Sequence, residues 1–198
     1  MNKSFFVVGT DTNVGKTYIS ALLCNQLSYN YLKLIQCGLI RDVDYVSNLI
    51  GREKIIDSCY EFKTPSSPHY ALEIENIKID IKKINKTIQE NKFNTIIECA
   101  GGLLTPVDRL ISFTDIVSEN KIDAILVSHG AVGAINQVLS AVVVLDKFNI
   151  NLAAIVLSGD ISFDNYDFIK SKTQHSVFKL EKNSQVIDEN LIKLLKNY

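Results

Sequence analysis

Residues 5–17 of the chain read FFVVGTDTNVGKT. The aromatic and β-branched residues at positions 5–8 predict a buried strand, and the apolar-faced segment that starts at Tyr18 predicts a helix. Between them lies a glycine-containing loop that ends in Gly15, Lys16 and Thr17, the arrangement that a phosphate-binding loop requires. Backbone N–H groups of the loop and of the helix N-terminus would point at one anion, Lys16 would add a positive charge, and the Thr17 hydroxyl would hold Mg²⁺. We therefore predict a nucleotide phosphate site here.

The loop is a variant of the strict phosphate-binding pattern. That pattern places a glycine where this chain has Thr10, and the nearest glycine is Gly9. An ordinary strand-to-helix turn that happens to contain Gly and Lys is the alternative interpretation. The strand before the loop and the helix after it favour the phosphate site.

The composition is that of an ordinary globular protein. The chain has 198 residues, of which 46% are hydrophobic and 22% charged, so it fits one domain with a substantial core. A net charge of −1 gives no global basic field that would attract nucleic acid or a membrane surface. The four cysteines are far apart in the sequence, which argues against a zinc site or a disulfide framework and favours free thiols in a reducing cytosol. With no visible export signal and no apolar run of membrane-spanning length, we expect a cytoplasmic protein without nucleic-acid or membrane partners.

Continuous apolar runs separated by helical patterns predict the fold class. Beyond the first strand, we expect strands at residues 31–37, 60–62, 95–99, 124–128, 152–157 and 176–178. We expect helices at residues 42–49, within 77–93, through 138–145 and around 191–195, and a rigid proline-containing loop at 64–68. Unbroken apolar strands alternating with helices are typical of an α/β fold with three layers, in which a mostly parallel sheet has helices on both faces.

Polar residues at the ends of these strands indicate where a ligand would bind, because the carboxyl ends of parallel strands meet at one edge of the sheet. Mg²⁺ on a nucleotide prefers a hydroxyl, carboxylates and phosphate oxygens, and Thr17, Asp44 and Glu98 would supply the protein ligands. Glu98 ends an apolar strand, where an unpaired carboxylate would be strongly unfavourable. A buried glutamate that pairs with a structural lysine is the alternative. Lys33, also in an apolar strand, is either paired structurally or faces the site and stabilises developing negative charge.

Together these residues resemble dethiobiotin synthetase, the ATP-dependent carboxylase that closes the ureido ring of biotin. The resemblance runs from the first strand to about Val156 and covers most of the chain. It is carried by residues 9–17, Lys33, Cys37-Gly38, Asp44, residues 65–69 (PSSPH), residues 98–102 (ECAGG), Thr105-Pro106 and residues 132–136 (VGAIN). It implies one P-loop NTPase-type domain over residues 1–198.

The resemblance also implies a reaction. In the family, CO₂ adds to one amine of 7,8-diaminononanoate to give a carbamate, which then takes the γ-phosphoryl group of ATP. The neighbouring amine closes the ring and releases phosphate. Lys16 and Lys33 would flank the carbamate and the γ-phosphate as catalytic residues, and Mg²⁺ would bridge the phosphates.

The remaining site residues follow from the same resemblance. The nucleotide would be bound by Asn13, Val14, Gly15, Lys16, Thr17, Tyr18, Asp44, Glu98, Cys99, Ala100 and Gly101. The substrate would be bound by Thr12, Lys33, Cys37, Val132, Gly133, Ala134 and Asn136. In the family the residues corresponding to Val132–Asn136 hold the tail carboxylate of the substrate from the partner subunit, so a homodimer is expected.

Three positions depart from the family pattern. Cys37 stands where the family commonly has Ser, so a hydroxyl hydrogen bond to the substrate is replaced by a weaker thiol one. Cys99 stands where Gly is usual, and the adenine-reading Asn is absent near Ser158. The proline-containing loop that covers the base is absent as well, so we expect loose base selection, with CTP or GTP used at rates comparable to ATP.

Two rival functions share this fold. A partition or septum-placing switch ATPase would carry a second lysine early in the phosphate loop, where this chain has Thr10, Asp11 and Thr12. Another ATP-dependent amidoligase would need an ammonia source, and this short chain shows no glutaminase domain. ATP hydrolysis that depends on a diamine and bicarbonate would separate the three.

Overall fold

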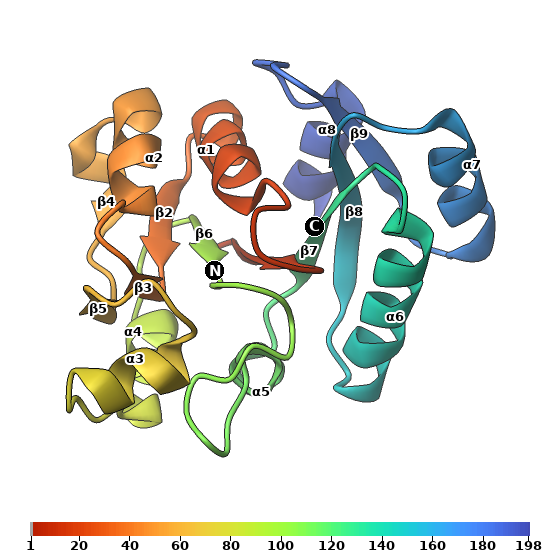
Figure 1. The fold of residues 1–198 in the computed structure, drawn as a ribbon. Helices are drawn as coiled ribbons and strands as arrows, with labels where there is room; N and C mark the ends of the chain where they lie inside the picture. Colours follow the sequence, from red (N-terminus) through yellow and green to blue (C-terminus); the bar gives the residue numbers. More distant parts are fainter. Residues whose placement is uncertain (1) are drawn as a thin grey trace.

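A seven-stranded parallel sheet forms the centre of the molecule (Figure 1). The computed structural model describes residues 2–198, except for the side chain of Phe163. The strands of the sheet lie in the order β4-β2-β6-β1-β7-β8-β9, and every neighbouring pair is parallel. Their bounds are β1 Ser4–Gly9, β2 Asn30–Lys33, β4 Ile55–Ile56, β6 Thr95–Glu98, β7 Ala124–His129, β8 Leu152–Gly159 and β9 Val177–Glu181. The predicted mostly parallel sheet is confirmed.

The first strand lies in the middle of this sheet. β1 pairs with β6 on one side and with β7 on the other. After β1 the chain adds β2 beyond β6, whereas β7, β8 and β9 extend the sheet in the opposite direction. The strand order therefore changes direction beside β1, and in open α/β sheets the crevice at such a point is where ligands bind.

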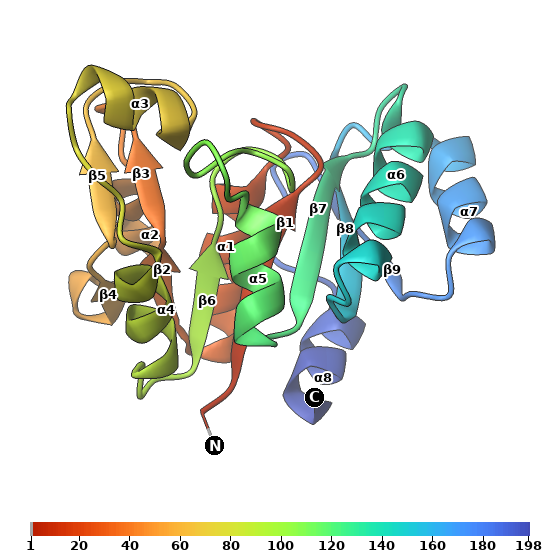
Figure 2. The same cartoon turned by 90° about the horizontal axis from the view of Figure 1, so that it is seen from below.

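Helices cover both faces of the sheet (Figure 2). On one face, α1, α2 and α8 pack on β1 residues Phe5 and Val7. On the other face, α4, α5, α6 and α7 pack on Phe6 and Val8, because successive side chains of a strand point to opposite sides. The helix bounds are α1 Lys16–Leu27, α2 Asp42–Ile50, α3 Pro68–Ile74, α4 Ile81–Gln89, α5 Phe113–Asn120, α6 Ala134–Lys147, α7 Phe163–Lys172 and α8 Glu189–Asn197, with a short 3₁₀ helix η1 at Arg52–Lys54.

The predicted strand at residues 31–37 is wrong in one respect, because it is divided between two sheets. β2 ends at Lys33, and β3 (Ile35–Cys37) pairs instead with β5 (Tyr60–Phe62) in a separate two-stranded sheet. At the break, the Leu34 N–H donates to the Glu98 carbonyl, and the Cys59 N–H donates to the Leu34 carbonyl. β6 stops at Glu98, so the chain beyond Leu34 has no further strand of the large sheet to follow and pairs with β5.

Local capping explains other differences from the predicted helices. The pattern at residues 77–93 gives a helix only from Ile81, because the Asp80 side chain accepts a hydrogen bond from the Lys82 N–H and caps that end. Pro68 is the first residue of α3 rather than part of the preceding loop. Proline is tolerated there because a backbone N–H at the first position of a helix has no partner within the helix. The short helices α3, α5 and α7 were not predicted, although α5 begins with a capping box between Ser112 and Asp115.

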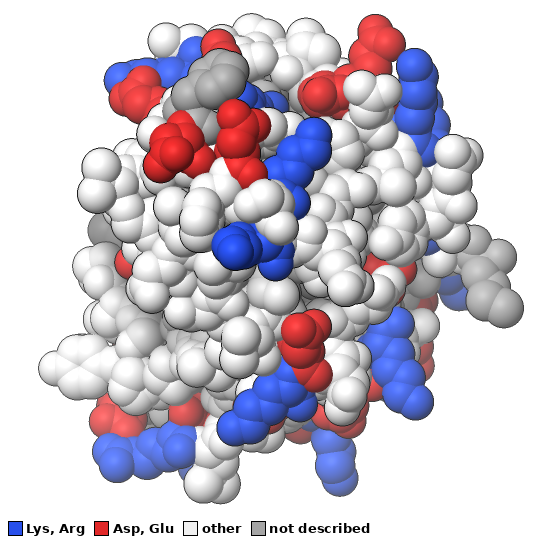
Figure 3. All heavy atoms as spheres, turned by 90° about the vertical axis from the view of Figure 1, so that its right-hand side faces the viewer, with Lys and Arg blue, Asp and Glu red and all other residues white. Residues whose placement is uncertain are grey.

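Charges of both signs are mixed on the side of the molecule that carries α6 and α7 (Figure 3). On that face, Lys and Arg residues lie among Asp and Glu residues and broad uncharged areas. All four cysteines are free thiols, as predicted. None of the helices within residues 2–198 combines the length and apolarity needed to cross a membrane.

Candidate active site

The phosphate-binding loop connects β1 to α1 at the centre of the sheet. Gly9 ends β1, and a Cβ atom there would lie 2.8 Å from Lys16 Nζ and 2.9 Å from the Asp11 carbonyl, so only glycine allows the lysine to fold over the loop. Gly15 precedes α1 with a φ of +96°, a conformation that glycine adopts without strain. It leaves α1 without a side-chain cap, so the first N–H groups of this helix are available to an anion.

Three neighbouring elements hold the loop in place. The Thr10 hydroxyl donates to Ser128 Oγ on β7 at 3.0 Å and lies 3.3 Å from Gln137 Oε1 on α6. The Ser158 hydroxyl at the end of β8 donates to the Val14 carbonyl at 2.6 Å. The residue in the place of the usual glycine, Thr10, therefore ties the loop to β7 and α6.

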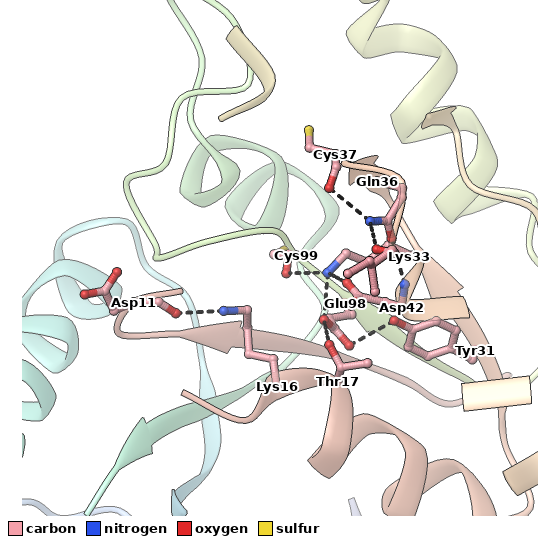
Figure 4. Close-up of polar contacts among 11 residues, drawn as sticks. Asp11, Lys16, Thr17, Tyr31, Lys33, Gln36, Cys37, Asp42, Glu98 and Cys99 are labelled. Atoms are coloured by element: carbon pink, nitrogen blue, oxygen red, sulfur yellow. Dashed lines mark hydrogen bonds and ion pairs between the residues drawn. The ribbon is translucent and has the colours of Figure 1, made fainter. Parts of the chain in front are cut away.

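Lys16 folds back over the loop. Its ammonium group donates to the Asp11 carbonyl at 2.7 Å (Figure 4). Burial lowers the pKa of Lys16 from 10.5 to about 8, although the nearby Glu98 carboxylate acts in the opposite direction. A bound phosphate would supply a negative charge beside this buried ammonium and would stabilise its protonated form.

Glu98 is the centre of a buried polar cluster (Figure 4). Its carboxylate is fully buried at the end of β6, and strand register places it directly opposite Lys33 of β2. Oε1 accepts hydrogen bonds from the Thr17 hydroxyl at 2.9 Å and from Lys33 Nζ at 2.7 Å. Oε2 accepts from the Tyr31 hydroxyl at 2.9 Å. Every oxygen of this buried charge therefore has a partner, as burial requires.

Lys33 lies between two carboxylates. Besides Glu98, its ammonium group contacts Asp42 Oδ2 at 2.5 Å. Burial alone would lower the pKa of Lys33, but Glu98 and Asp42 outweigh it and raise the pKa above its ordinary value. Lys33 thus carries its positive charge into the cavity that also contains the phosphate loop.

Asp44 does not reach this cluster, and Asp42 occupies the position expected for it. Asp42 is the first residue of α2, where its side chain points back at Lys33. Asp44, two residues later, is turned about 200° around the helix axis. Its side chain is 63% exposed and lies 3.8 Å from Arg41, so the structure brings Asp42, and not the predicted Asp44, to Lys33.

Gln36 fixes the connection from β3 to α2. Its buried amide group donates to the carbonyls of Cys37 at 3.1 Å and Ile40 at 3.2 Å, and its Oε1 accepts from the Asp42 N–H at 3.0 Å. The amide thereby caps the N-terminus of α2 from outside the helix, since Arg41 makes no side-chain cap.

A cavity of about 930 Å³ joins the phosphate loop, the Glu98 cluster and the β3–α2 connection. This volume is within the range of small-molecule sites. Of the predicted site residues it is lined by Thr12, Asn13, Gly15, Lys16, Thr17, Tyr18, Lys33, Cys37, Glu98, Ala100 and Gly101. Gln36, Ile40, Arg41, Asp42, Tyr45, Pro65–Pro68 and Thr105 also line it.

Other predicted residues lie outside this cavity. Val14 is buried and its carbonyl is occupied by Ser158. Cys99 points into the apolar core, where burial raises its thiol pKa to about 12, so its side chain is a packing residue and only its carbonyl lies near Lys33, at 3.5 Å. Val132, Gly133, Ala134 and Asn136 lie at the start of α6 and are not among the residues that line this cavity.

Two site residues, Asp42 and Tyr31, were missed by sequence reasoning. The sequence did contain an indication for Asp42. It is an acidic residue at the first position of the helix that follows the strand of Lys33, and such a residue faces back toward that strand. Tyr31 looks like any apolar strand residue, and only the register of β2 against β6 reveals its contact with Glu98.

The donor set suits Mg²⁺. Thr17 Oγ1 and Glu98 Oε1 lie 2.9 Å apart, and the ammonium group of Lys33 contacts both Glu98 and Asp42. A hydroxyl and two carboxylates therefore converge beside the phosphate loop. Hard oxygen ligands completed by phosphate oxygens are what Mg²⁺ prefers. Within residues 2–198 no group of three or more His, Cys, Asp or Glu side chains is arranged to hold a metal ion.

Comparison with solved structures supports the fold. The chain superimposes on the septum site-determining protein MinD complexed with Mg-ADP from Pyrococcus horikoshii with a TM-score of 0.55, covering 100% of this chain and 96% of that chain at 12% identity. The MinC:MinD cell division protein complex of Aquifex aeolicus gives a TM-score of 0.57, with 98% and 86% coverage at 14% identity. At such low identity the likeness shows a shared α/β fold alone.

Sequence relatives are more specific. A family model described as "AAA domain" matches residues 3–190. A protein of Lawsonia intracellularis named ATP-dependent dethiobiotin synthetase BioD is 39% identical over 166 residues, covering 83% of this chain and 80% of the relative. A protein of the same name from Campylobacter jejuni is 35% identical over 187 residues, covering 94% and 90%. With such relatives aligned over most of both sequences, this chain belongs to the ATP-dependent dethiobiotin synthetase family.

Proposed function

We propose that this protein is a ligase that converts 7,8-diaminononanoate, CO₂ and ATP into dethiobiotin, ADP and phosphate. The observation that carries the proposal is the position of Lys33, whose ammonium group lies 2.7 Å from Glu98 and 2.5 Å from Asp42 in the cavity of the phosphate loop. A cation held there would lie beside both a nucleotide phosphate and a second anionic reactant. The relatives' shared name supports the reaction.

The two lysines offset the charge of two anions that must meet. A carbamate on one amine of the substrate would attack the γ-phosphorus of ATP, and the second amine would then close the ring with loss of phosphate. Lys16 stabilises the phosphate charge from the loop side, while Lys33 stabilises the carbamate from the β2 side. Each charge-assisted hydrogen bond contributes about 1.5–3 kcal/mol.

Thr17, Asp42 and Glu98 would hold Mg²⁺ on the nucleotide. When bound, Mg²⁺ neutralises phosphate charge and orients the transferring group. Lys33, which lines the same cavity, would supply the positive charge that stabilises the carbamate. Thr17 contributes a neutral hydroxyl, so the two carboxylates supply the charge of the site.

Thr12 and Cys37 would line the diamine pocket. Burial raises the pKa of the Cys37 thiol to about 11, so it stays protonated at neutral pH and donates a weak hydrogen bond.

The tail carboxylate of the substrate would bind to the start of α6 in a partner subunit. There Val132 and Gly133 are exposed, and the helix has no side-chain cap to compete for its N–H groups.

Base selection follows from Ser158. Its hydroxyl already donates to the Val14 carbonyl, so this side chain supports the phosphate loop instead of reading a base. We therefore expect CTP and GTP to be used at rates comparable to ATP. A thousandfold preference for ATP in steady-state kinetics would contradict this expectation.

The two rival functions predict different dependence on substrate. The fold is shared with MinD, so a switch ATPase would hydrolyse ATP without the diamine. An amidoligase would need ammonia and a carboxylate substrate.

A coupled assay of phosphate release tests the proposal. We expect release to require both 7,8-diaminononanoate and bicarbonate, and to match dethiobiotin formation measured by mass spectrometry. Lys16→Ala and Lys33→Ala should each lower turnover by more than about 10²-fold, the scale of removing a preorganised charged donor. Lys193→Ala, on the exposed surface of α8, is the matched control. Phosphate release that does not depend on the diamine would refute the proposed reaction. Near wild-type turnover in either lysine variant would refute the catalytic role of that lysine.

A further inference from the structure

Tyr31 makes a contact with Glu98 that the reaction described above does not use. Its hydroxyl donates to Glu98 Oε2 at 2.9 Å from the middle of β2. The ring is fully buried in the apolar cluster beneath α1 and α2. Tyr31 lies two residues before Lys33, so both side chains point to the same face of the sheet as Glu98, their neighbour on β6.

The two oxygens of Glu98 face different partners. Oε1 faces the Thr17 hydroxyl and the Lys33 ammonium group in the cavity, whereas Oε2 faces only Tyr31 in the interior among these hydrogen bonds (Figure 4). A carboxylate held at Oε2 cannot rotate about its last bond without losing that hydrogen bond. The hydroxyl thereby determines the plane of the carboxylate and the direction in which Oε1 points.

We propose that Tyr31 is a positioning residue that holds Glu98 Oε2 and so presents Oε1, beside the Thr17 hydroxyl, to Mg²⁺ on the nucleotide. This inference rests on the proposed function, because it assigns Glu98 to the metal. Hydrogen-bonding partners of metal ligands orient those ligands, and their removal typically weakens metal binding 10–100-fold.

Packing alone does not explain the hydroxyl. A phenylalanine would fill the same space in this apolar cluster without placing a polar group there. Among the residues that the structure describes, the hydrogen-bond partner of this hydroxyl is the carboxylate of Glu98. Conversely, without Tyr31 the Oε2 atom would be a buried acceptor of a charged group with no donor, and the carboxylate would turn to seek one.

Tyr31→Phe tests this role, with Tyr29→Phe as the matched control. Tyr29 is also buried and immediately precedes β2. Mn²⁺, a paramagnetic substitute for Mg²⁺, would be titrated into each protein in the presence of saturating ADP and followed by electron paramagnetic resonance. We expect the Kd for Mn²⁺ to rise about 10–100-fold in Tyr31→Phe and to stay within about twofold of wild type in Tyr29→Phe. The Kd for ADP without metal should be unchanged in both.

A purely structural role would give a different result. In that case Tyr31→Phe would lower the Tm and leave the Kd for Mn²⁺ unchanged, which would overturn the inference. Tyr31→Met, which also lacks a hydroxyl and has a flexible apolar side chain, should show the same loss of Mn²⁺ affinity and serves if the Phe variant does not fold.

The Mn²⁺ titration and the assay of dethiobiotin formation together distinguish a failure of the proposed function from a failure of the role of Tyr31. If wild-type protein binds Mn²⁺ with ADP but forms no dethiobiotin, the reaction is wrong and the positioning role of Tyr31 stands on the titration. If wild-type protein forms dethiobiotin while Tyr31→Phe binds Mn²⁺ normally, the reaction stands and the role of Tyr31 is wrong. Wild-type protein that binds no Mn²⁺ with ADP would overturn the inference together with the metal site.

Discussion

At the scale of single residues, Asp42 and Asp44 show how strongly function depends on side-chain direction. Both are acidic and both lie in the first turn of α2. Asp42 contacts Lys33 at 2.5 Å, whereas Asp44 is mostly exposed beside Arg41. Surface ion pairs such as that of Asp44 contribute little to stability, while removing one partner of a buried ion pair such as Lys33–Asp42 leaves an uncompensated charge.

We therefore expect opposite outcomes for two matched substitutions. Asp42→Asn should lower kcat/KM by at least about 10-fold and raise the Mg²⁺ concentration needed for half-maximal activity. Asp44→Asn should change both by less than about twofold and leave the free energy of unfolding within about 0.5 kcal/mol. Initial rates across a Mg²⁺ titration measure the difference. Equal effects of the two substitutions would show that Asp42 is not a metal ligand.

The thiol of Cys37 gives a prediction about pH. Burial raises its pKa from 9.0 to about 11, so the thiolate, the reactive form, is scarce at neutral pH. At about pH 8 we expect iodoacetamide to modify Cys37 roughly 100-fold more slowly than an ordinary thiol.

The pH dependence of the modification rate tests whether the raised pKa of Cys37 causes its slow reaction. As pH rises from about 7.5 to 9.5, more thiolate forms, so the rate should increase about tenfold per unit without levelling off near 9. Peptide mass spectrometry identifies the modified residue, and glutathione is the reference thiol. A rate that levels off near pH 9 would show that Cys37 has an ordinary pKa. Cys24, Cys59 and Cys99 are buried and should react still more slowly.

At the scale of elements, the break between β2 and β3 creates the site. Because the chain leaves the large sheet at Leu34, Lys33 stays beside Glu98 while Cys37 moves to the small sheet at the other side of the cavity. Gln36 then connects this small sheet to the start of α2 through three hydrogen bonds. The position of Asp42 therefore depends on an amide group that touches no reactant.

Replacing Gln36 should loosen this connection. In Gln36→Met the volume is kept, but the Cys37 and Ile40 carbonyls and the Asp42 N–H lose their partner, so we expect a loss of about 1–3 kcal/mol in the free energy of unfolding. Turnover should fall too, because Asp42 is no longer held against Lys33. Urea denaturation and steady-state rates measure the two effects.

Gln89→Met is the control for this substitution. Gln89 is an exposed residue at the end of α4 with one long hydrogen bond to Asn120. It should lose less than about 0.5 kcal/mol and keep full turnover. If Gln36→Met is as stable and active as this control, the amide does not position α2.

At the scale of the whole molecule, the cavity of one chain does not contain every predicted substrate residue. Thr12, Lys33 and Cys37 line the cavity, whereas Val132–Asn136 lie at the exposed start of α6. A twofold-symmetric dimer in which each chain completes the site of the other would unite them. Such an arrangement would make the site a property of two chains.

Mixing two inactive variants tests whether the site is shared. Lys33→Ala and Asn136→Ala would each be inactive as homodimers. After unfolding and refolding together, half of the dimers would be mixed, and each mixed dimer would contain one site with both native residues, so we expect about a quarter of wild-type activity. Phosphate release measures recovery, and sedimentation confirms the dimer. No recovery in mixed dimers would place all substrate contacts within one chain.

The large features of this protein were predictable from local sequence. Apolar runs of strand length, helical periodicity and the loop at residues 9–17 specify the backbone locally, and they indicated a parallel sheet with a phosphate loop at the end of β1. Lys16 and Thr17 were identified from the phosphate-loop pattern, and Lys33 and Glu98 because charged groups are uncommon in apolar strands. The strand break at Leu34 was not predictable, since residues 31–37 (YLKLIQC) contain no glycine, proline or other turn signal, and the end of β6 is what stops the pairing.

The sequence alone determined the type of fold and the family to which the chain belongs. Only the tertiary structure decided that Asp42 and not Asp44 meets Lys33, that Gln36 caps α2, and that the Tyr31 hydroxyl holds Glu98. The physical reason is that backbone preference is encoded by neighbours along the chain. Which side chains meet depends on the register of strands and the rotation of helices, and these are determined by packing among segments far apart in the sequence.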